Sequence, residues 1–303
     1  MARKNTFWAV GLLALAGVGG YVHVLTRAVP EAPTLQRPAI TVIGHAGSGF
    51  FTPLNPFNPL PPSSLAGLQR ALARGADGVE IDVRLSRDSV PFIYHDPTLN
   101  SMSTGEGCVS QYTAAELETL AYRGGLVYDL FHDEHLMRLQ TVLEALPHGP
   151  NAPIIHLDLH EDDNCAAATS PSRSPVLVRA LARLLRTSSL PPERLLILSM
   201  NKKTVVALRQ QLPAVPLGLE ITKDFEKGLQ TAIQQKVQAV VVSKDVITPE
   251  RSGRARAAGF QVIVFGGRSP KAVARLVSCR PDAIEVDNVP ELLAQLGRRL
   301  PQE

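Results

Sequence analysis

Short apolar runs recur along the chain, and segments of helical length separate them. The runs are Ile40–Ile43, Gly78–Val83, Ile154–Leu159, Leu195–Ser199, Pro216–Leu219, Ala239–Val242, Val262–Phe265 and Ala283–Val286. Near-continuous hydrophobic strands that alternate with helices indicate a parallel sheet. Eight such units over about 250 residues predict an α/β fold of the (β/α)8 TIM-barrel type. A doubly wound open sheet is the alternative, but the glycine-rich dinucleotide motif is absent after the first run.

The segments between the runs carry helix start and stop signals. Ser63 or Ser64 can cap a helix that begins near Leu65 and ends at Gly75. Several of the later segments likewise end at Gly or Pro. The further predicted helices are Val176–Leu185, Lys203–Gln211, Phe225–Gln235, Pro249–Ala258 and Pro270–Val277.

One stretch, GVEIDVRLSRDSVPFIYHDP (78–97), combines a strand with candidate chemistry. Glu80, Asp82 and Arg84 alternate with aliphatic residues, so in a strand they share one face. Two carboxylates and a guanidinium together suit a divalent cation and an anionic substrate. His95 follows closely, and a histidine can carry protons near neutral pH.

Polar residues also follow most of the other predicted strands. TIM barrels place their chemistry at the carboxyl ends of the strands. The candidates at these positions are His45, Asp158, His160, Asn201, Glu220, Lys244 and Asp287. A purely structural barrel does not need this pattern, so we expect a site at this end.

These motifs resemble the glycerophosphodiester phosphodiesterase family. The family's pattern is His-Arg-Gly on the first strand, then Glu-x-Asp, a nearby His-Asp and a later Glu-x-Lys. This chain has Gly44-His45-Ala46-Gly47, Glu80-Ile81-Asp82 and His95-Asp96-Pro97 in that order. Leu198-Ser199-Met200-Asn201 and Asp287-Asn288-Val289-Pro290 also match in position. The resemblance covers most of residues 40–296 and implies a (β/α)8 fold with metal-dependent cleavage of a phosphodiester.

By position, the resemblance implies a metal site and an acid–base pair. Glu80, Asp82 and Asp158 would hold Mg²⁺ or Ca²⁺, both of which prefer oxygen ligands. His45 and His95 would be catalytic, one ring deprotonating the nucleophile and the other protonating the leaving alkoxide.

The chain departs from the family pattern at two site positions. The Arg of His-Arg-Gly is Ala46, so a phosphate-contacting cation is missing unless Arg84 or another cation substitutes for it. Glu-x-Lys becomes Asp158-Leu159-His160, in which His160 replaces the lysine charge only when it is protonated. Arg84 and His160 are therefore tentative phosphate ligands.

The expected activity is hydrolysis of glycerophosphodiesters or lysophospholipids. A phospholipase D of the sphingomyelinase D type is a second enzymatic reading, since that family also uses Asp at the corresponding ligand. A catalytically silent barrel that binds phospholipid head groups is the alternative from another class. The net charge of +3 is too small to indicate a nucleic-acid partner.

The first residues predict a membrane anchor. Arg3 and Lys4 precede an uncharged stretch from Thr6 to Thr26, which is about long enough to cross a bilayer. We expect a signal anchor or transmembrane segment over residues 1–28, a proline-rich linker over 29–38 and a barrel domain over 39–303. The catalytic domain would then be exported (periplasmic or extracytoplasmic). A cleaved signal peptide, which would give a secreted protein, and a buried helix are the alternatives.

The three cysteines have no metal-type spacing. In an exported domain, Cys108 and Cys165 can form a bridge between two loops and leave Cys279 free. Three unpaired thiols are the alternative.

Overall fold

A computed structural model of the chain describes residues 39–49, 60–124, 126–167 and 169–299. The described residues belong to one compact unit, Ala39–Glu303. The predicted anchor and linker lie outside them. No helix in the described ranges is long and apolar enough to cross a membrane.

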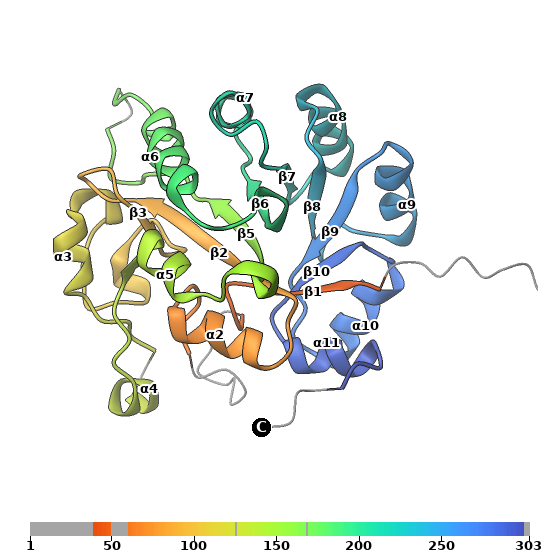
Figure 1. Cartoon of the computed structure of the whole chain (residues 1–303), viewed down its shortest axis with the longest axis horizontal. Coiled ribbons are helices and arrows are strands. Elements are labelled where there is room, and N and C mark those ends of the chain that lie inside the picture. Colours follow the sequence, from red (N-terminus) through yellow and green to blue (C-terminus); the bar gives the residue numbers. More distant parts are fainter. Residues whose placement is uncertain (1–38, 50–59, 125, 168, 300–303) are drawn as a thin grey trace, which may run out of the picture. The chain divides into compact units, whose positions relative to one another are not determined.

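Eight parallel strands close into a barrel, as the sequence predicts (Figure 1). They are β1 (Thr41–Gly44), β2 (Gly78–Leu85), β5 (Ile154–Leu159), β6 (Leu195–Leu198), β7 (Leu217–Ile221), β8 (Ala239–Ser243), β9 (Gln261–Phe265) and β10 (Ala283–Val286). The β1–β10 and β1–β2 pairings close the ring. The open-sheet alternative is therefore wrong.

Helices follow most of the barrel strands and cover the outside. They are α2 (Leu65–Ala73), α5 (Leu139–Ala145), α6 (Ser174–Thr187), α7 (Lys202–Gln211), α8 (Phe225–Gln235), α9 (Pro249–Ala257), α10 (Pro270–Ser278) and α11 (Val289–Gln295). Side-chain caps fix where several begin: Ser64 accepts from Gly67 N–H, and Asp224 accepts from Lys227 N–H. Such caps satisfy amides that would otherwise lack a partner.

The segment between β2 and β5 is longer than a single crossover helix. It holds β3 (Pro91–Ile93), β4 (Met137–Arg138), α3 (Ala114–Glu118), α4 (Leu126–Phe131) and two 3₁₀ turns, Leu99–Ser101 and Val109–Gln111. β3 pairs antiparallel with β2 and extends the sheet at one side. The inserted segment has its own small hydrophobic core around Phe92, Tyr94 and Leu117.

Strand alternation divides the side chains between two cores. Val79, Ile81 and Val83 pack outward against the helices, as the alternation in the sequence predicts. Inside the barrel, Ile43, Leu196, Leu198, Ala239, Val241, Ile263 and Ala283 form a separate apolar cluster. Beyond this apolar cluster, at the carboxyl ends of the strands, several strands carry polar residues at their inward positions.

Candidate active site

A cavity of about 160 Å³ opens at the carboxyl ends of the strands. Apolar side chains form part of its wall: Leu198, Val241 and Phe265. The polar residues that line it are His45, Glu80, Asp82, His95, Asp158, His160, Glu220 and Glu285. The structure thus brings together the predicted acid–base histidines and the predicted metal ligands.

Glu80, Asp82 and Asp158 come from two adjacent strands. In the β2–β5 register Asp82 lies opposite Asp158, and Glu80 lies one inward position below. One oxygen from each of the three carboxylates lies within 4.8 Å of the others. Glu80 and Asp82 are almost fully buried, and Asp158 is largely buried.

Burial gives these carboxylates unequal proton affinities. The pKa of Glu80 rises well above its usual value because of burial and the charge of Asp82. The pKa of Asp158 also rises, mainly through burial and then through Glu220. Burial alone would raise the pKa of Asp82 too, but the hydrogen bond and charge of His160 lower it instead. Repelling buried carboxylates of this kind favour a bound cation.

The hydrogen bonds of Glu80 also suit a site for a divalent metal. Glu80 Oε2 accepts a 2.6 Å hydrogen bond from Ala46 N–H. Glu80 Oε1 is buried and has no hydrogen-bond partner in the described structure. A buried, unsatisfied carboxylate oxygen is costly, and a cation at the neighbouring carboxylates would satisfy it. The donor set is all oxygen, which suits Mg²⁺ or Ca²⁺.

The loop after β1 is bent tightly to deliver the Ala46 amide. Gly47 N–H donates to Gly44 carbonyl oxygen at 3.2 Å, and a Cβ at Gly44 would lie 2.0 Å from the Gly47 oxygen. Ala46 adopts a positive φ of 46°. Its methyl group is buried, so this position offers Glu80 a backbone donor and offers substrate no charge.

His45, at the end of β1, is held by Asp287 from the end of β10. The distance from Nδ1 to Asp287 Oδ1 is 2.7 Å. Burial by itself lowers the pKa of His45, but Asp287, with help from Glu285 and Asp82, outweighs burial and raises it to about 9. His45 is therefore protonated at neutral pH.

His95 has a carboxylate partner of its own. Its Nδ1 lies 2.6 Å from Asp96 Oδ1. Burial lowers the pKa of His95, but Asp96 and the charge of Asp82 raise it above its usual value overall. His95 is more exposed than His45, at 35% against 16% of its side-chain surface.

His160 lies inside the cavity beside the carboxylates. Its Nε2 is 2.8 Å from Asp82 Oδ1 and 3.4 Å from Asp158 Oδ2. Ser63 Oγ donates to the other oxygen of Asp82 at 2.7 Å. A carboxylate accepts about four hydrogen bonds or ligand contacts, so Asp82 keeps capacity for a metal.

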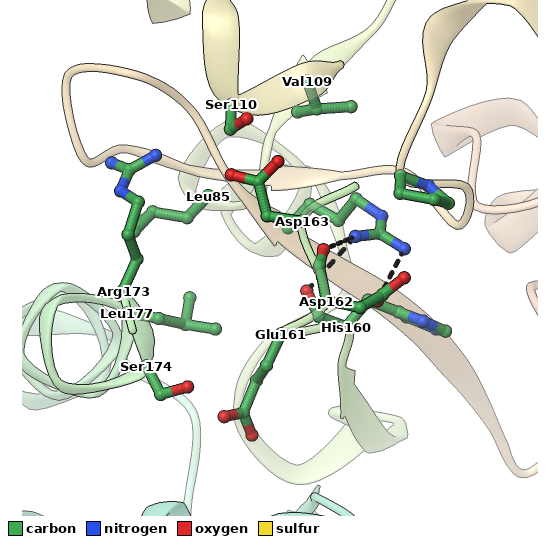
Figure 2. Close-up of a pocket in the computed structure, with 12 residues that line it drawn as sticks. Leu85, Val109, Ser110, His160, Glu161, Asp162, Asp163, Arg173, Ser174 and Leu177 are labelled. Atoms are coloured by element: carbon green, nitrogen blue, oxygen red, sulfur yellow. Dashed lines mark hydrogen bonds and ion pairs between the residues drawn. The ribbon is translucent and has the colours of Figure 1, made fainter. Parts of the chain in front are cut away.

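Arg84, one of the two tentative phosphate ligands, does not line this cavity. Its Nε donates to the His95 carbonyl oxygen at 2.7 Å, and its Nη1 donates to the Asp162 carbonyl oxygen at 2.8 Å. Nη2 pairs with Asp162 Oδ1 at 3.1 Å. Asp162 lines a separate cavity of about 40 Å³ (Figure 2). Carbonyl oxygens on two loops hold the guanidinium, and Arg84 therefore joins the loops that carry His95 and His160.

Sequence reasoning did not assign several contributors. Asp287 stood out as a polar residue after a strand and in the Asp287-Asn288-Val289-Pro290 match, but without a role, and Glu220 stood out only as a polar residue after a strand. The sequence does mark Glu285 as unusual, because it is an acidic residue within an apolar strand, two positions before Asp287. Glu285 Oε1 lies 2.6 Å from His156 Nδ1 in the buried interior. Ser63 had no signal beyond helix capping.

Of the two alternatives for the cysteines, the structure shows the bridge. Cys108 and Cys165 are bridged with a Cα–Cα distance of 5.9 Å, and Cys279 is free and buried. The bridge ties the loop after β5, which begins at His160, to the segment that follows β3. Two cross-links, this disulfide and the Arg84 contacts, therefore hold that loop.

Comparisons with known proteins give one consistent result. Residues 56–291 match the model of the glycerophosphoryl diester phosphodiesterase family. A glycerophosphodiester phosphodiesterase of Caldanaerobacter subterraneus is 23% identical over 241 residues, which cover 79% of this chain and 93% of that protein. Glycerophosphodiester phosphodiesterase 1 of Mus musculus is 23% identical, with 80% of this chain and 79% of the relative covered.

Solved structures show the same fold. A phosphodiesterase of Oleispira antarctica, in complex with the product sn-glycerol-3-phosphate, superposes with a TM-score of 0.72 at 21% identity. The match covers 86% of this chain and 97% of the other.

The Asp287 contact predicts the protonation of His45. In Asp287→Asn, the neutral amide removes the charge that outweighs burial, so the pKa of His45 should fall from about 9 to near or below its usual 6.5. Because the folded-state pKa is raised, the pair's contribution to stability is full below pH 6.5 and is lost as pH rises through about 9. Ring ¹⁵N NMR titration of the metal-free protein measures the pKa.

Asp133→Asn is the matched control, because Asp133 is an exposed partner of a different histidine. It should leave the His45 titration unchanged. A His45 pKa that stays near 9 in Asp287→Asn would contradict the assignment.

Proposed function

The chain belongs to the glycerophosphoryl diester phosphodiesterase family and is a phosphoric diester hydrolase, and we propose that it hydrolyses glycerophosphodiesters with a carboxylate-bound divalent cation. The observation that carries the proposal is the convergence of His45, His95 and three carboxylates on one cavity. The glycerol-3-phosphate bound to the structural relative from Oleispira antarctica supports this substrate class.

Glu80, Asp82 and Asp158 would hold the cation, Mg²⁺ or Ca²⁺. When bound, such an ion neutralises phosphate charge and orients the diester for in-line attack. The all-oxygen donor set and the unsatisfied Glu80 oxygen support this assignment.

His45 and His95 would divide the proton transfers. Asp287 keeps His45 protonated at neutral pH, so His45 is ready to donate a proton to the leaving alkoxide. The charge of Asp82 contributes to the raised pKa of His95, so a cation bound to Asp82 would weaken this contribution. His95 would then be the ring that accepts the nucleophile's proton, with its orientation fixed by Asp96.

The positive charge near the phosphate would come from His160. Ala46 supplies only a backbone amide, and the guanidinium of Arg84 is held by the loops outside the cavity. His160 is the remaining tentative ligand, and it lies among the carboxylates in the same cavity.

Metal removal tests the core of the proposal. Hydrolysis of glycerophosphocholine by the full chain should cease in EDTA and return when Mg²⁺ or Ca²⁺ is added, with product measured as free choline and glycerol-3-phosphate. Lysophosphatidylcholine and sphingomyelin belong in the same panel. Turnover of sphingomyelin alone would favour the phospholipase D reading, and no turnover of any diester by the folded protein would favour a silent barrel.

Removal of either histidine tests the acid–base pair. His45→Ala and His95→Ala should each lower kcat by about 10²- to 10⁴-fold, the usual contribution of a general acid or base. Circular dichroism and thermal unfolding should show an intact fold. His148→Ala removes an exposed histidine that precedes β5, away from the site, and should keep wild-type kcat. Near-normal turnover in either site variant would refute that residue's role.

We also propose that residues 1–28 anchor the barrel to a membrane, that residues 29–38 are a linker and that the catalytic domain is exported. The Cys108–Cys165 bridge supports export, because disulfides persist in oxidising compartments. The full chain with a C-terminal epitope should sediment with membranes, retain its N-terminus and expose the epitope to protease outside the cytoplasm. A mature N-terminus near residue 28 would show cleavage and secretion, and a protected epitope would refute export.

A further inference from the structure

Two histidines and a carboxylate converge at one wall of the cavity, beside the three-carboxylate site. His160 Nε2 approaches Asp82 Oδ1 to 2.8 Å. The rings of His95 and His160 meet edge to face, with centroids 4.7 Å apart. One ligand atom from each of Asp82, His95 and His160 lies within 4.8 Å of the other two.

We propose that Asp82, His95 and His160 form a second cation site that binds a borderline transition-metal ion such as Zn²⁺. Its donors are two imidazole nitrogens and one carboxylate oxygen. Imidazole favours Zn²⁺ over Mg²⁺ and Ca²⁺, whereas an all-carboxylate set favours the latter ions. Asp82 belongs to both donor sets, so the two sites share one residue but differ in chemistry.

The surroundings hold both rings in place for such an ion. Asp96 Oδ1 binds His95 Nδ1, so a metal would bind through Nε2. A carboxylate behind a ligating histidine is a recurring feature of zinc sites, because it fixes the ring and raises its basicity. Arg84 binds the backbone of the His95 and His160 loops, which keeps the two rings at one spacing.

Access and ligand number also suit a labile ion. His95 and His160 are partly exposed, at 35% and 19% of their side chains, so the site opens to solvent. Three protein ligands leave a fourth tetrahedral position for water or a phosphate oxygen.

The second site depends on the departure at His160. A lysine, which the family pattern has at this position, is protonated at neutral pH and offers three donors but no lone pair to a metal. A histidine offers a ring nitrogen. The change from Glu-x-Lys to Asp158-Leu159-His160 therefore adds a ligand where the family pattern has a cation.

An ion at this site would inhibit the enzyme. It would occupy the ring nitrogen of His95 that the proposed mechanism needs for proton transfer. This consequence rests on the proposed function, whereas metal binding by Asp82, His95 and His160 does not.

Binding is tested on the full chain in excess Mg²⁺. Zn²⁺ is added in steps while long-range ¹H–¹⁵N NMR follows the histidine ring nitrogens, and a competing chelator gives Kd. We expect the Nε2 signals of His95 and His160 to shift together and saturate at one equivalent. His160→Gln should weaken Zn²⁺ binding at least tenfold.

Two controls separate this site from its neighbours. His148→Gln removes an exposed histidine elsewhere and should leave Kd unchanged. Glu80→Gln removes a ligand of the three-carboxylate site that is not among the three proposed Zn²⁺ donors, and it should change Kd for Zn²⁺ by less than threefold. The proposal is overturned if the His95 and His160 signals do not move, if His160→Gln binds Zn²⁺ as the wild type does, or if Glu80→Gln abolishes binding.

Inhibition is tested separately by glycerophosphocholine hydrolysis in Mg²⁺. Half-inhibition of the wild type should occur near the Kd measured by NMR, and Zn²⁺ binding without inhibition would refute the inhibitory role. If the wild type hydrolyses no diester, the proposed function fails, and the NMR titration still decides whether the cation site exists.

Discussion

Buried negative charge is the constraint on which the mouth of this barrel depends. Glu80 and Asp82 are almost fully buried on adjacent inward positions of one strand, and Asp158 faces Asp82 from the next. An isolated buried carboxylate is strongly destabilising unless it is neutralised, paired or hydrogen-bonded. The surrounding structure supplies this compensation: the amide of Ala46 binds Glu80, while Ser63 and His160 bind Asp82. The compensation is incomplete at Glu80 Oε1, which is why the site favours a cation.

The barrel and the centre of its site could be predicted because both follow from local patterns. Strand alternation alone places Glu80 and Asp82 on the same face, and strand polarity places His45 beside them. Side-chain contacts between strands that are far apart in the sequence produce no local sequence pattern. The contact between His45 and Asp287 joins residues 242 positions apart. Asp287 can be identified as the partner of His45 only once β1 is known to pair with β10. The antiparallel extension β3–β4 was missed for a similar reason, because those strands are only three and two residues long.

Arg84 shows that a position on a strand can be predicted from the sequence while the contacts of its side chain cannot. It does follow Glu80 and Asp82 on the strand, but it stands one step beyond the cavity rim. There its planar guanidinium, with five N–H donors, meets carbonyl oxygens of two loops. The sequence cannot indicate which backbone carbonyl oxygens will bind Arg84, since every residue has a carbonyl oxygen. The charge that would have faced a phosphate instead fixes the positions of His95 and His160.

The two departures from the family pattern therefore act on one property, the positive charge available inside the cavity. Ala46 removes a permanent charge and keeps the backbone donor that Glu80 needs. His160 replaces a second permanent charge with a ring whose charge is conditional, since it can bind a proton or a metal ion but not both at the same nitrogen. A site with a lysine and an arginine keeps its charge across the physiological pH range. In this chain the proposed phosphate contact is His160, and the same ring lies in edge-to-face contact with His95. Under the two proposals, proton transfer by His95 and cation binding at His160 would be coupled through one pair of imidazoles.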